Sequence, residues 1–287
     1  MASAPGPTQR GRMRYRHLRN ATAILELGSR RWLIDPMLAE VGAMPGFKLF
    51  GGGRRANPLV PLPEGTPAWL DEVTDVVVTH EHPDHFDAAA RAWARERNLP
   101  VWASPTDVPS LRRRELDARP IAELGVPVEV VPAKHGRGAL GWLMGPVSGF
   151  FFAPPGEPSL FLTSDATWTD ALEAAIARLR PDVIVAPAGS ANMGLGGDIL
   201  FSVDELVRLV RAAPGEVVLN HLEALDHCPT RRDVLRACMA DEALSERVWI
   251  PEDGEARVLR GEGPSVTELR AGAPAPDLRK WLTAKLA

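Results

Sequence analysis

The alternation of apolar and polar residues begins with a predicted β-hairpin near the amino end. Residues 21–27 (ATAILEL) and 31–35 (RWLID) form two short apolar runs separated by Gly28 and Ser29, which are typical turn residues. The pattern then lapses over residues 36–67, which hold three consecutive glycines and several prolines. A loop of this length inside a compact domain is usually functional or mobile. We therefore expect it to lie near a site.

From residue 75 onward, short β-branched runs alternate with amphipathic segments. The predicted strands cover residues 75–79, 101–104, 126–131, 159–164, 182–187 and 216–220, with an apolar stretch at 149–153 and short strands at 248–250 and 256–259. The predicted helices cover residues 88–97, 169–179, 204–213 and 231–239, and a last one lies near 278–286. A hairpin early and strand–helix units later predict one α/β domain of two mixed sheets packed together, with helices outside.

The composition is that of an ordinary globular protein and narrows the choice of partners. Hydrophobic residues make up 45% and charged residues 24% of the 287 residues, and the net charge of −4 argues against a dedicated nucleic-acid binder. The charge is uneven, because residues 1–20 hold five arginines and no acidic residue. We predict a solvated basic arm over residues 1–20 ahead of a domain at 21–287, with arginines reaching an anionic substrate as the alternative.

The chain shows no pattern for a membrane span or for export. No stretch approaches the roughly 18 uninterrupted apolar residues of a membrane span, and no apolar signal-peptide segment follows the arginines. The two cysteines, Cys228 and Cys238, are too few for a disulfide framework and lack the spacing of a zinc ribbon. We expect a cytoplasmic protein whose two thiols are reduced and buried.

Three histidines and an aspartate follow the predicted strand 75–79 in the sequence HEHPDH. His80 and His82 are two residues apart, so in extended backbone both side chains point the same way and can bind one ion. Asp84 and His85, one step further, can face a second ion. Imidazole and carboxylate ligands suit zinc, iron or manganese, and the lack of cysteine here argues against a purely structural zinc. The cluster therefore predicts a metal site that does chemistry.

The motif THEHPDH after a run of valines resembles the T-H-x-H-x-D-H signature of the metallo-β-lactamase superfamily. The resemblance extends over residues 33–255 and points to the branch of ascorbate-6-phosphate-lactonase-like hydrolases and their uncharacterised bacterial relatives. The segments APPGEPSLFL (153–162) and HLEALDHC (221–228) support this branch. The resemblance implies an αββα sandwich with a one- or two-metal site at one edge.

The resemblance also implies a set of ligands for two metals. The first metal would be bound by His80, His82 and His135. The second metal would be bound by Asp84, His85 and His221, with the Asp165 carboxylate bridging both ions. His227 is the alternative to His221, which we favour because it comes directly after the predicted strand 216–220, where site residues tend to lie. Asp165 follows Ser164, where relatives usually have glycine.

The implied function is hydrolysis at a dinuclear centre that holds zinc, with manganese or iron as alternatives. A hydroxide between the metals would cleave an ester, lactone, amide or phosphoester of a small molecule, with an anionic substrate as a first guess and Asp84 as the acid/base group. One alternative is an iron-dependent oxidoreductase similar to persulfide dioxygenases. Another is a nucleic-acid phosphodiesterase of the same fold, although the chain shows no basic insert. We expect no nucleic-acid or membrane partner and leave a homo-oligomer open.

A few polar residues outside this set have two interpretations. Asp35 is either a group that orients a ligand histidine or a turn residue. Glu223 and Asp226 either contact the site or are solvated carboxylates. Arg54 and Arg55, in the long loop, either clamp an anionic substrate or belong to the solvated surface.

Overall fold

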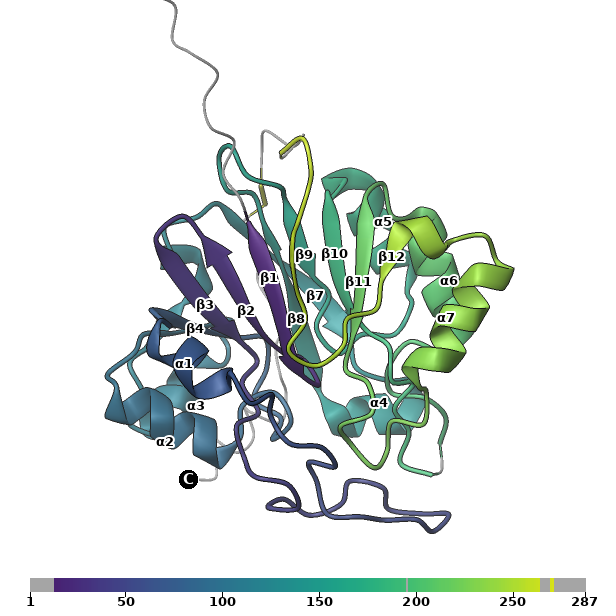
Figure 1. Ribbon diagram of the computed structural model, residues 1–287, viewed down its shortest axis with the longest axis horizontal. Helices are drawn as coiled ribbons and strands as arrows, with labels where there is room; N and C mark the ends of the chain where they lie inside the picture. Colours follow the sequence, from purple (N-terminus) through teal and green to yellow (C-terminus); the bar gives the residue numbers. More distant parts are fainter. Residues whose placement is uncertain (1–12, 195, 264–268, 271–287) are drawn as a thin grey trace, which may run out of the picture.

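Two β-sheets face each other and carry helices on their outer surfaces (Figure 1). The computed structural model describes residues 13–194, 196–263 and 269–270. In order across the first sheet, the strands are β13 (Ala256–Val258), β1 (Arg14–Arg19), β2 (Thr22–Leu27), β3 (Arg30–Ile34), β4 (Asp75–Val78), β5 (Val101–Ala103) and β6 (Ala118–Pro120). Across the second sheet they are β12 (Val248–Trp249), β11 (Glu216–Asn220), β10 (Val183–Pro187), β9 (Leu160–Leu162), β8 (Pro146–Phe152) and β7 (Val128–Lys134).

The helices divide between the two outer faces. Those on the first sheet are α1 (Thr66–Asp71), α2 (Ala88–Glu96) and α3 (Val108–Arg113), and those on the second are α5 (Asp170–Leu179), α6 (Val203–Ala212) and α7 (Arg232–Asp241). The helix α4 (Gly138–Met144) and the 3₁₀ turns η1 (Ile121–Glu123) and η2 (Ser245–Arg247) lie in the connections. Together the layers form the predicted αββα sandwich. Within the described residues, no helix is long and apolar enough to span a membrane.

The valine run of β4 shows how the layers bury their side chains. Val77 packs in the core between the sheets, against residues such as Trp32 and Phe152. Val76 and Val78 point the other way and pack with Phe86 and the helices of the first sheet. A strand covered on both faces is apolar throughout, which explains why this run lacks the alternation of a half-exposed strand.

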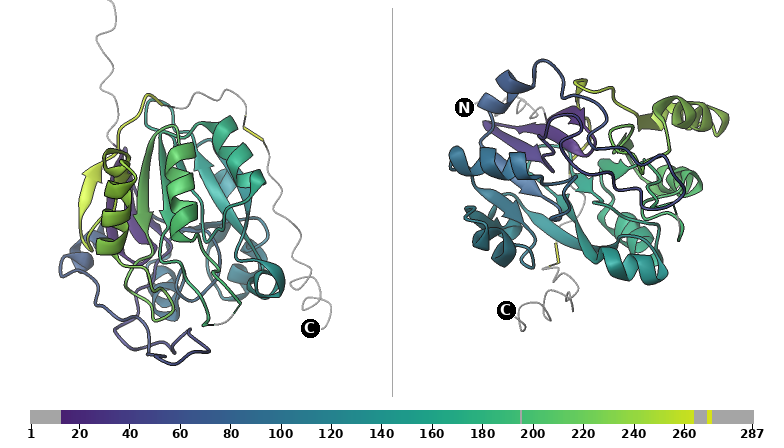
Figure 2. Two further views of the ribbon diagram at one scale, coloured as in Figure 1. Left: turned by 90° about the vertical axis from the view of Figure 1, so that its right-hand side faces the viewer. Right: turned by 90° about the horizontal axis from the view of Figure 1, so that it is seen from below.

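The carboxyl ends of four strands come together at the lower edge in Figure 1. The strands β3 to β6 are parallel, as are β9 to β12. The strand β7 runs antiparallel to β8, which in turn runs antiparallel to β9, so β7 and β9 point the same way. The mostly irregular segment 35–65 passes across this edge, as both Figure 1 and the left view of Figure 2 show. The prediction of a long loop near the site is confirmed.

The predicted basic arm is wrong for the part of it that the structure describes. Residues 14–19 form β1, a central strand between β13 and β2. Tyr15 and His17 alternate toward the interior, and Arg19 is fully buried. Its guanidinium group donates hydrogen bonds to the carbonyls of Val60, Met37 and Ala39. The arginine-rich composition hides this strand, because its alternation of buried and partly exposed residues becomes plain only once it is paired in the sheet. Residues 1–12 and the predicted helix at 278–286 lie outside the described residues.

Several short elements were not predicted. They are α1, α3, α4 and β6, all of which begin or end in segments rich in proline, glycine or arginine. The strand predicted from residue 126 begins instead at Val128, because Pro127 cannot donate a ladder hydrogen bond. The remaining predicted strands and helices match the structure to within a few residues.

Candidate metal centre

The seven predicted ligands converge from four strand ends at this edge. His80, His82, Asp84 and His85 follow β4, and His135 follows β7. Asp165 lies three residues after β9, and His221 directly follows β11. Six of the seven side chains are buried and His82 is half-buried. The two sheets thus contribute facing halves of one site.

The ligand atoms form two adjoining groups, each within 4.8 Å: His80, His82 and His135 make one, and Asp84, His85, Asp165 and His221 make the other. In the first group, His80 Nε2 lies 3.1 Å from His82 Nδ1. In the second, His221 Nε2 lies 3.2 Å from an Asp84 carboxylate oxygen. Two ligands at about 2.0–2.1 Å from one tetrahedral zinc ion are separated by about 3.3 Å. The spacing therefore fits donors that share an ion.

Asp165 lies between the two groups. Its Oδ2 is 3.5 Å from His135 Nε2 and 3.8 Å from His221 Nε2, while its Oδ1 is 3.1 Å from His85 Nε2. His80 Nε2 lies 3.9 Å from the same Oδ2, so one carboxylate faces two histidines of the first group and two of the second. This is the arrangement that a bridging ligand requires.

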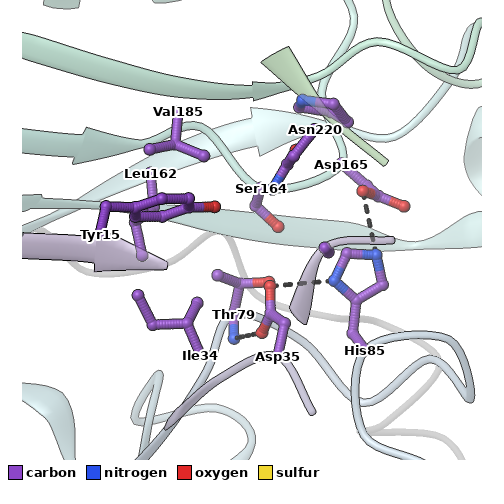
Figure 3. Close-up of a pocket in the computed structure, with 12 residues that line it drawn as sticks. Tyr15, Ile34, Asp35, Thr79, His85, Leu162, Ser164, Asp165, Val185 and Asn220 are labelled. Carbon is purple, nitrogen blue, oxygen red and sulfur yellow. Dashed lines mark hydrogen bonds and ion pairs between the residues drawn. The ribbon is translucent and has the colours of Figure 1, made fainter. Parts of the chain in front are cut away.

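Most of the imidazoles are held from behind through Nδ1. His85 Nδ1 contacts an Asp35 carboxylate oxygen at 2.9 Å, and His135 Nδ1 contacts the carbonyl of Ile199 at 2.9 Å. Figure 3 shows the His85 ring between Asp35 and Asp165. Such contacts fix the tautomer and leave Nε2 free for a metal. His82 has the opposite orientation: its Nδ1 faces His80 Nε2, so His82 would bind the metal through Nδ1.

The histidine pKa values differ between the two groups. Burial lowers the pKa of His80 well below its usual value and that of His135 to about 4. Burial would also lower the pKa of His85, but the surrounding carboxylates, Asp165 foremost, outweigh it and raise that pKa to about 10. The pKa of His221 is raised for the same reason. In the absence of metal, protons on His85 and His221 therefore balance the negative charge of the carboxylates in the second group.

Two buried atoms at the centre of the site, His85 Nε2 and Asp165 Oδ1, lie 3.1 Å from each other and have no other hydrogen-bond partner. Within the described residues, no lysine or arginine forms an ion pair with Asp84 or Asp165. Buried polar atoms are normally paired, and buried carboxylates normally have a cationic partner. A divalent cation satisfies both needs, so the residues fit the metals that the sequence predicts.

Comparison with known proteins agrees with the fold. The model of the beta-lactamase superfamily domain matches residues 30–222. The chain belongs to the metallo-β-lactamase superfamily. It is 31% identical over 261 residues to the UPF0173 protein YddR of Bacillus subtilis, which covers 85% of this chain and 99% of that protein.

Two solved structures of this superfamily fold are similar over most of the chain. A possible metal-dependent hydrolase from Veillonella parvula has a TM-score of 0.79 and 30% identity and covers 86% of this chain and 100% of its own. An isothiocyanate hydrolase from Delia radicum gut bacteria has a TM-score of 0.77 and 27% identity and covers 86% and 99%.

Three residues that follow strand ends have an unusual backbone conformation. Asp35, Ser164 and His221 all adopt left-handed backbone conformations, with φ of 43°, 59° and 60°. Glycine is favoured in this region, which gives a physical reason for the glycine expected at position 164. Non-glycine residues in this region store strain and cluster at functional sites. At Ser164 this conformation leads directly into Asp165, which lies in the second donor group.

The structure separates His221 from its alternative, His227. His221 lies in the second group, whereas His227 belongs to neither group formed by the described residues. The His227 ring packs edge-on against Phe47 of the long loop, at 5.4 Å between centroids. The preference for His221 over His227 therefore agrees with the geometry.

The residues with two interpretations are also placed. Asp35 is an orienting group, since its carboxylate accepts hydrogen bonds from the Thr79 amide and hydroxyl as well as facing His85. Asp226 accepts backbone N–H bonds from Phe47, Lys48 and Arg55 and so fastens the long loop. Glu223 pairs with Arg232. Arg54 donates to the carbonyl of Gly46.

Two contacts of the ligand histidines had no signal in the sequence. The carbonyl of Ile199, which contacts His135, comes from a segment without a motif. The thiol of Cys228 lies 3.5 Å from His221 Nδ1. Both depend on how the loops fold over the edge, and neither residue type is diagnostic for a metal site.

Proposed function

We propose that this chain is a metal-dependent hydrolase with a dinuclear centre that holds zinc. The observation that carries the proposal is the pair of adjoining donor groups with Asp165 between them, where two buried atoms have no hydrogen-bond partner other than each other. His80, His82 and His135 would hold one ion, and Asp84, His85 and His221 the other. Manganese and iron accept the same donor types and are alternatives for the metal.

The chain's own residues supply position and proton transfer. Two ions at these donors provide Lewis acidity and lower the pKa of water, which makes hydroxide available at neutral pH. Asp35 keeps the His85 ring oriented, and the Ile199 carbonyl does the same for His135. We assign Asp84 as the group that accepts a proton during the reaction, because its carboxylate is buried in the second group, beside His221 and His85. Carboxylates in such positions commonly act as acid/base groups.

The border of the site is apolar and favours a substrate that carries an apolar group. The His82 ring forms a hydrogen bond with the backbone of Met144 at the end of α4, so this helix directly borders the proposed metal centre. Trp142 of α4 is 65% exposed and Phe50 of the long loop is 55% exposed. Met193 packs in the same cluster as Met144, and its carbonyl accepts the Phe50 amide. The isothiocyanate hydrolase that resembles this chain acts, by its name, on a small electrophile.

We therefore propose a small-molecule ester, lactone, amide, isothiocyanate or phosphoester as the substrate. The test is metal analysis of the purified protein together with hydrolysis of a panel of these compounds, each with an apolar and an anionic member. We expect close to two equivalents of zinc and faster turnover of the apolar members. Iron alone with oxygen uptake in place of hydrolysis would support the oxidoreductase alternative.

A pair of histidine variants makes the test specific. His82→Ala removes a donor of the first group, so we expect loss of metal and of turnover. His227→Ala removes a buried histidine that belongs to neither group, so we expect it to keep the metal content of the wild type. Equal metal content and turnover in both variants would show that the site assignment is wrong.

A further inference from the structure

A buried thiol stands directly behind one of the proposed metal ligands. Cys228 Sγ lies 3.5 Å from His221 Nδ1, on the side of the ring opposite Asp84. Cys228 is 8% exposed and packs in an apolar cluster with Leu225 and Ala224. Its backbone amide donates to the carbonyl of Leu225, so the turn that carries it is fixed. The thiol therefore has a defined place beside the ring.

The chain leaves room for this contact on a neighbouring segment. A Cβ atom at Gly189 would stand 2.9 Å from Cys228 Sγ and 2.5 Å from the carbonyl oxygen of His221. Both distances are too short for real contacts, so a side chain at position 189 would displace the cysteine or the histidine. The amide of Thr230 donates to the Gly189 carbonyl and ties the two segments together. Glycine at this position lets Cys228 approach His221.

The chemistry of imidazole gives the contact a role. A histidine that binds a metal through Nε2 carries its proton on Nδ1, and that N–H needs an acceptor that fixes the ring. For His85 and His135 the acceptor is an oxygen, of Asp35 and of Ile199. For His221 the neighbour at Nδ1 is the sulfur of Cys228, which is a weak acceptor.

We propose that Cys228 is a positioning residue, whose sulfur accepts a hydrogen bond from the Nδ1–H group of His221 and so aims Nε2 at the second ion. His85 Nε2 and Asp165 Oδ1 beside it have no hydrogen-bond partner other than each other, which makes this the half of the centre in need of a cation. The proposal rests on the metal site of the proposed function. It implies that the ion held by Asp84, His85 and His221 depends on a thiol, whereas the ion held by the first group does not.

The test compares metal binding by Cys228→Ala, Cys228→Ser and the matched control Cys238→Ser with that of the wild type. Cys238 is the only other cysteine and lies on α7, half-buried and packed in the core under that helix. Each protein is stripped of metal with a chelator, and its fold is checked by circular dichroism. It is then titrated with Zn²⁺ against a chelating indicator and with Co²⁺ by visible absorption.

We expect Cys228→Ala to weaken one of the two binding steps by about tenfold, at the lower end of what loss of such an orienting partner costs. The other step should stay as in the wild type, and Cys238→Ser should change neither. Cys228→Ser should bind the ion of the second group more tightly than Cys228→Ala does and the other ion equally well, because its hydroxyl also accepts a hydrogen bond from Nδ1–H. If Cys228 only packed, serine would be at least as harmful as alanine, because it places a polar group in an apolar cluster.

Nitrogen NMR of histidine-labelled, zinc-loaded protein provides a second readout. In the wild type, His221 should show a single tautomer with its proton on Nδ1, and Cys228→Ala should broaden or shift that signal alone. Unchanged binding and an unchanged His221 signal in Cys228→Ala would overturn the proposal, as would equal weakening of both steps. A wild-type protein that binds no ion would instead contradict the proposed function, so the two failures are distinguishable.

Discussion

Two buried clusters of charged side chains lie between the two sheets and their loops, and their buried charges are compensated in different ways. In the first, Arg232 donates hydrogen bonds to the carboxylates of Glu223 and Asp253 and to the carbonyl of Pro251. His17 adds a contact of 3.3 Å to Asp253. The guanidinium group is 7% exposed, and its two carboxylate partners are 26% exposed. Here the chain itself supplies the positive charge that the carboxylates need, although His17 Nδ1 has no hydrogen-bond partner.

The metal centre has no lysine or arginine among its described residues. Asp35, Asp84 and Asp165 are all buried, and within the described residues their charged partners are histidines, which are cationic only while they hold protons. His85 Nε2 and Asp165 Oδ1 have no hydrogen-bond partner other than each other. Because a folded chain rarely leaves buried charge uncompensated, the first cluster reads as structural and the second as a site for a ligand. The difference lies in where the positive charge comes from.

Removing the carboxylate between the two donor groups should have the largest effect. In Asp165→Asn the side chain keeps its size but loses its charge, so we expect loss of the second ion and a fall in turnover of about 10³-fold, since metal-based charge stabilisation is worth several kcal/mol. Metal content and turnover check this. The control is Asp253→Asn, which makes the same change in the Arg232 cluster and should keep the metals. Retention of both ions and turnover by Asp165→Asn would remove the reason to distinguish the clusters.

The opposite pattern is expected for Arg232→Met, which keeps the length of the side chain but removes its charge. Glu223 and Asp253 then lose their partner, and we expect the free energy of unfolding to fall by about 3 kcal/mol, the lower end for broken buried pairs because both carboxylates are partly exposed. Denaturant unfolding of the metal-free protein measures this. The folded variant should still bind two ions. A variant of normal stability that cannot bind metal would assign the cluster to the site instead.

The two clusters also differ in how far the sequence reveals them. The ligands could be predicted because four of them, such as His80 and His82, lie in one short motif, while Asp165 and His221 follow recognisable strands. The Arg232 cluster joins residues from distant parts of the chain, His17 and Asp253 among them, and no local pattern marks such a meeting. The strand β1 was missed for a related reason, since only its pairing with β2 and β13 shows that an arginine-rich segment is internal.

The role of Asp35 could be predicted only in part from the sequence. Its position after an apolar run fits a turn as well as an orienting role. The register of the parallel pair decides, because Ile34 lies opposite Val77 and the next residue can therefore reach Thr79. His85 then comes within 2.9 Å of the same carboxylate. The sequence alone does not reveal which residues of β3 and β4 lie opposite each other.

Asp35→Asn tests whether this orienting carboxylate tunes the centre. The amide keeps the shape and one oxygen acceptor but loses the charge that faces His85. We expect metal affinity to fall by roughly 10- to 100-fold, as for other groups that orient a metal-binding histidine. Competitive titration with Zn²⁺ measures the change, and Asp226→Asn, a substitution in the carboxylate that fastens the long loop, serves as the control. Unchanged affinity in Asp35→Asn would limit Asp35 to a structural role at the end of β3.

We expect the smallest effect from a change of pH by one unit. This effect should appear at the metal centre alone. The pKa of His85 is raised from 6.5 to about 10, because the carboxylates around it, Asp165 foremost, outweigh the opposing effect of burial. A group whose pKa is higher in the folded state stabilises the fold below its unfolded value and loses that contribution as pH rises through the folded value. Between these pH values the metal-free protein therefore loses this stabilisation, while bound metal takes the place of the proton. We expect metal affinity to rise with pH by up to about tenfold per unit for each proton displaced.

The Arg232 cluster should not respond over the same range. Burial alone would raise the pKa of Asp253, but His17 and Arg232 outweigh it and hold that pKa below the usual 3.8. The stabilising contribution of Asp253 is therefore present above that value and is lost only in acid. The measurement is the melting temperature of the loaded and metal-free proteins between about pH 6 and pH 9, with proton release followed by calorimetry in two buffers. A gap between the two melting temperatures that stays constant with pH, with no proton release, would mean that protons do not compete with the metal, and the contrast between the clusters would lose its electrostatic basis.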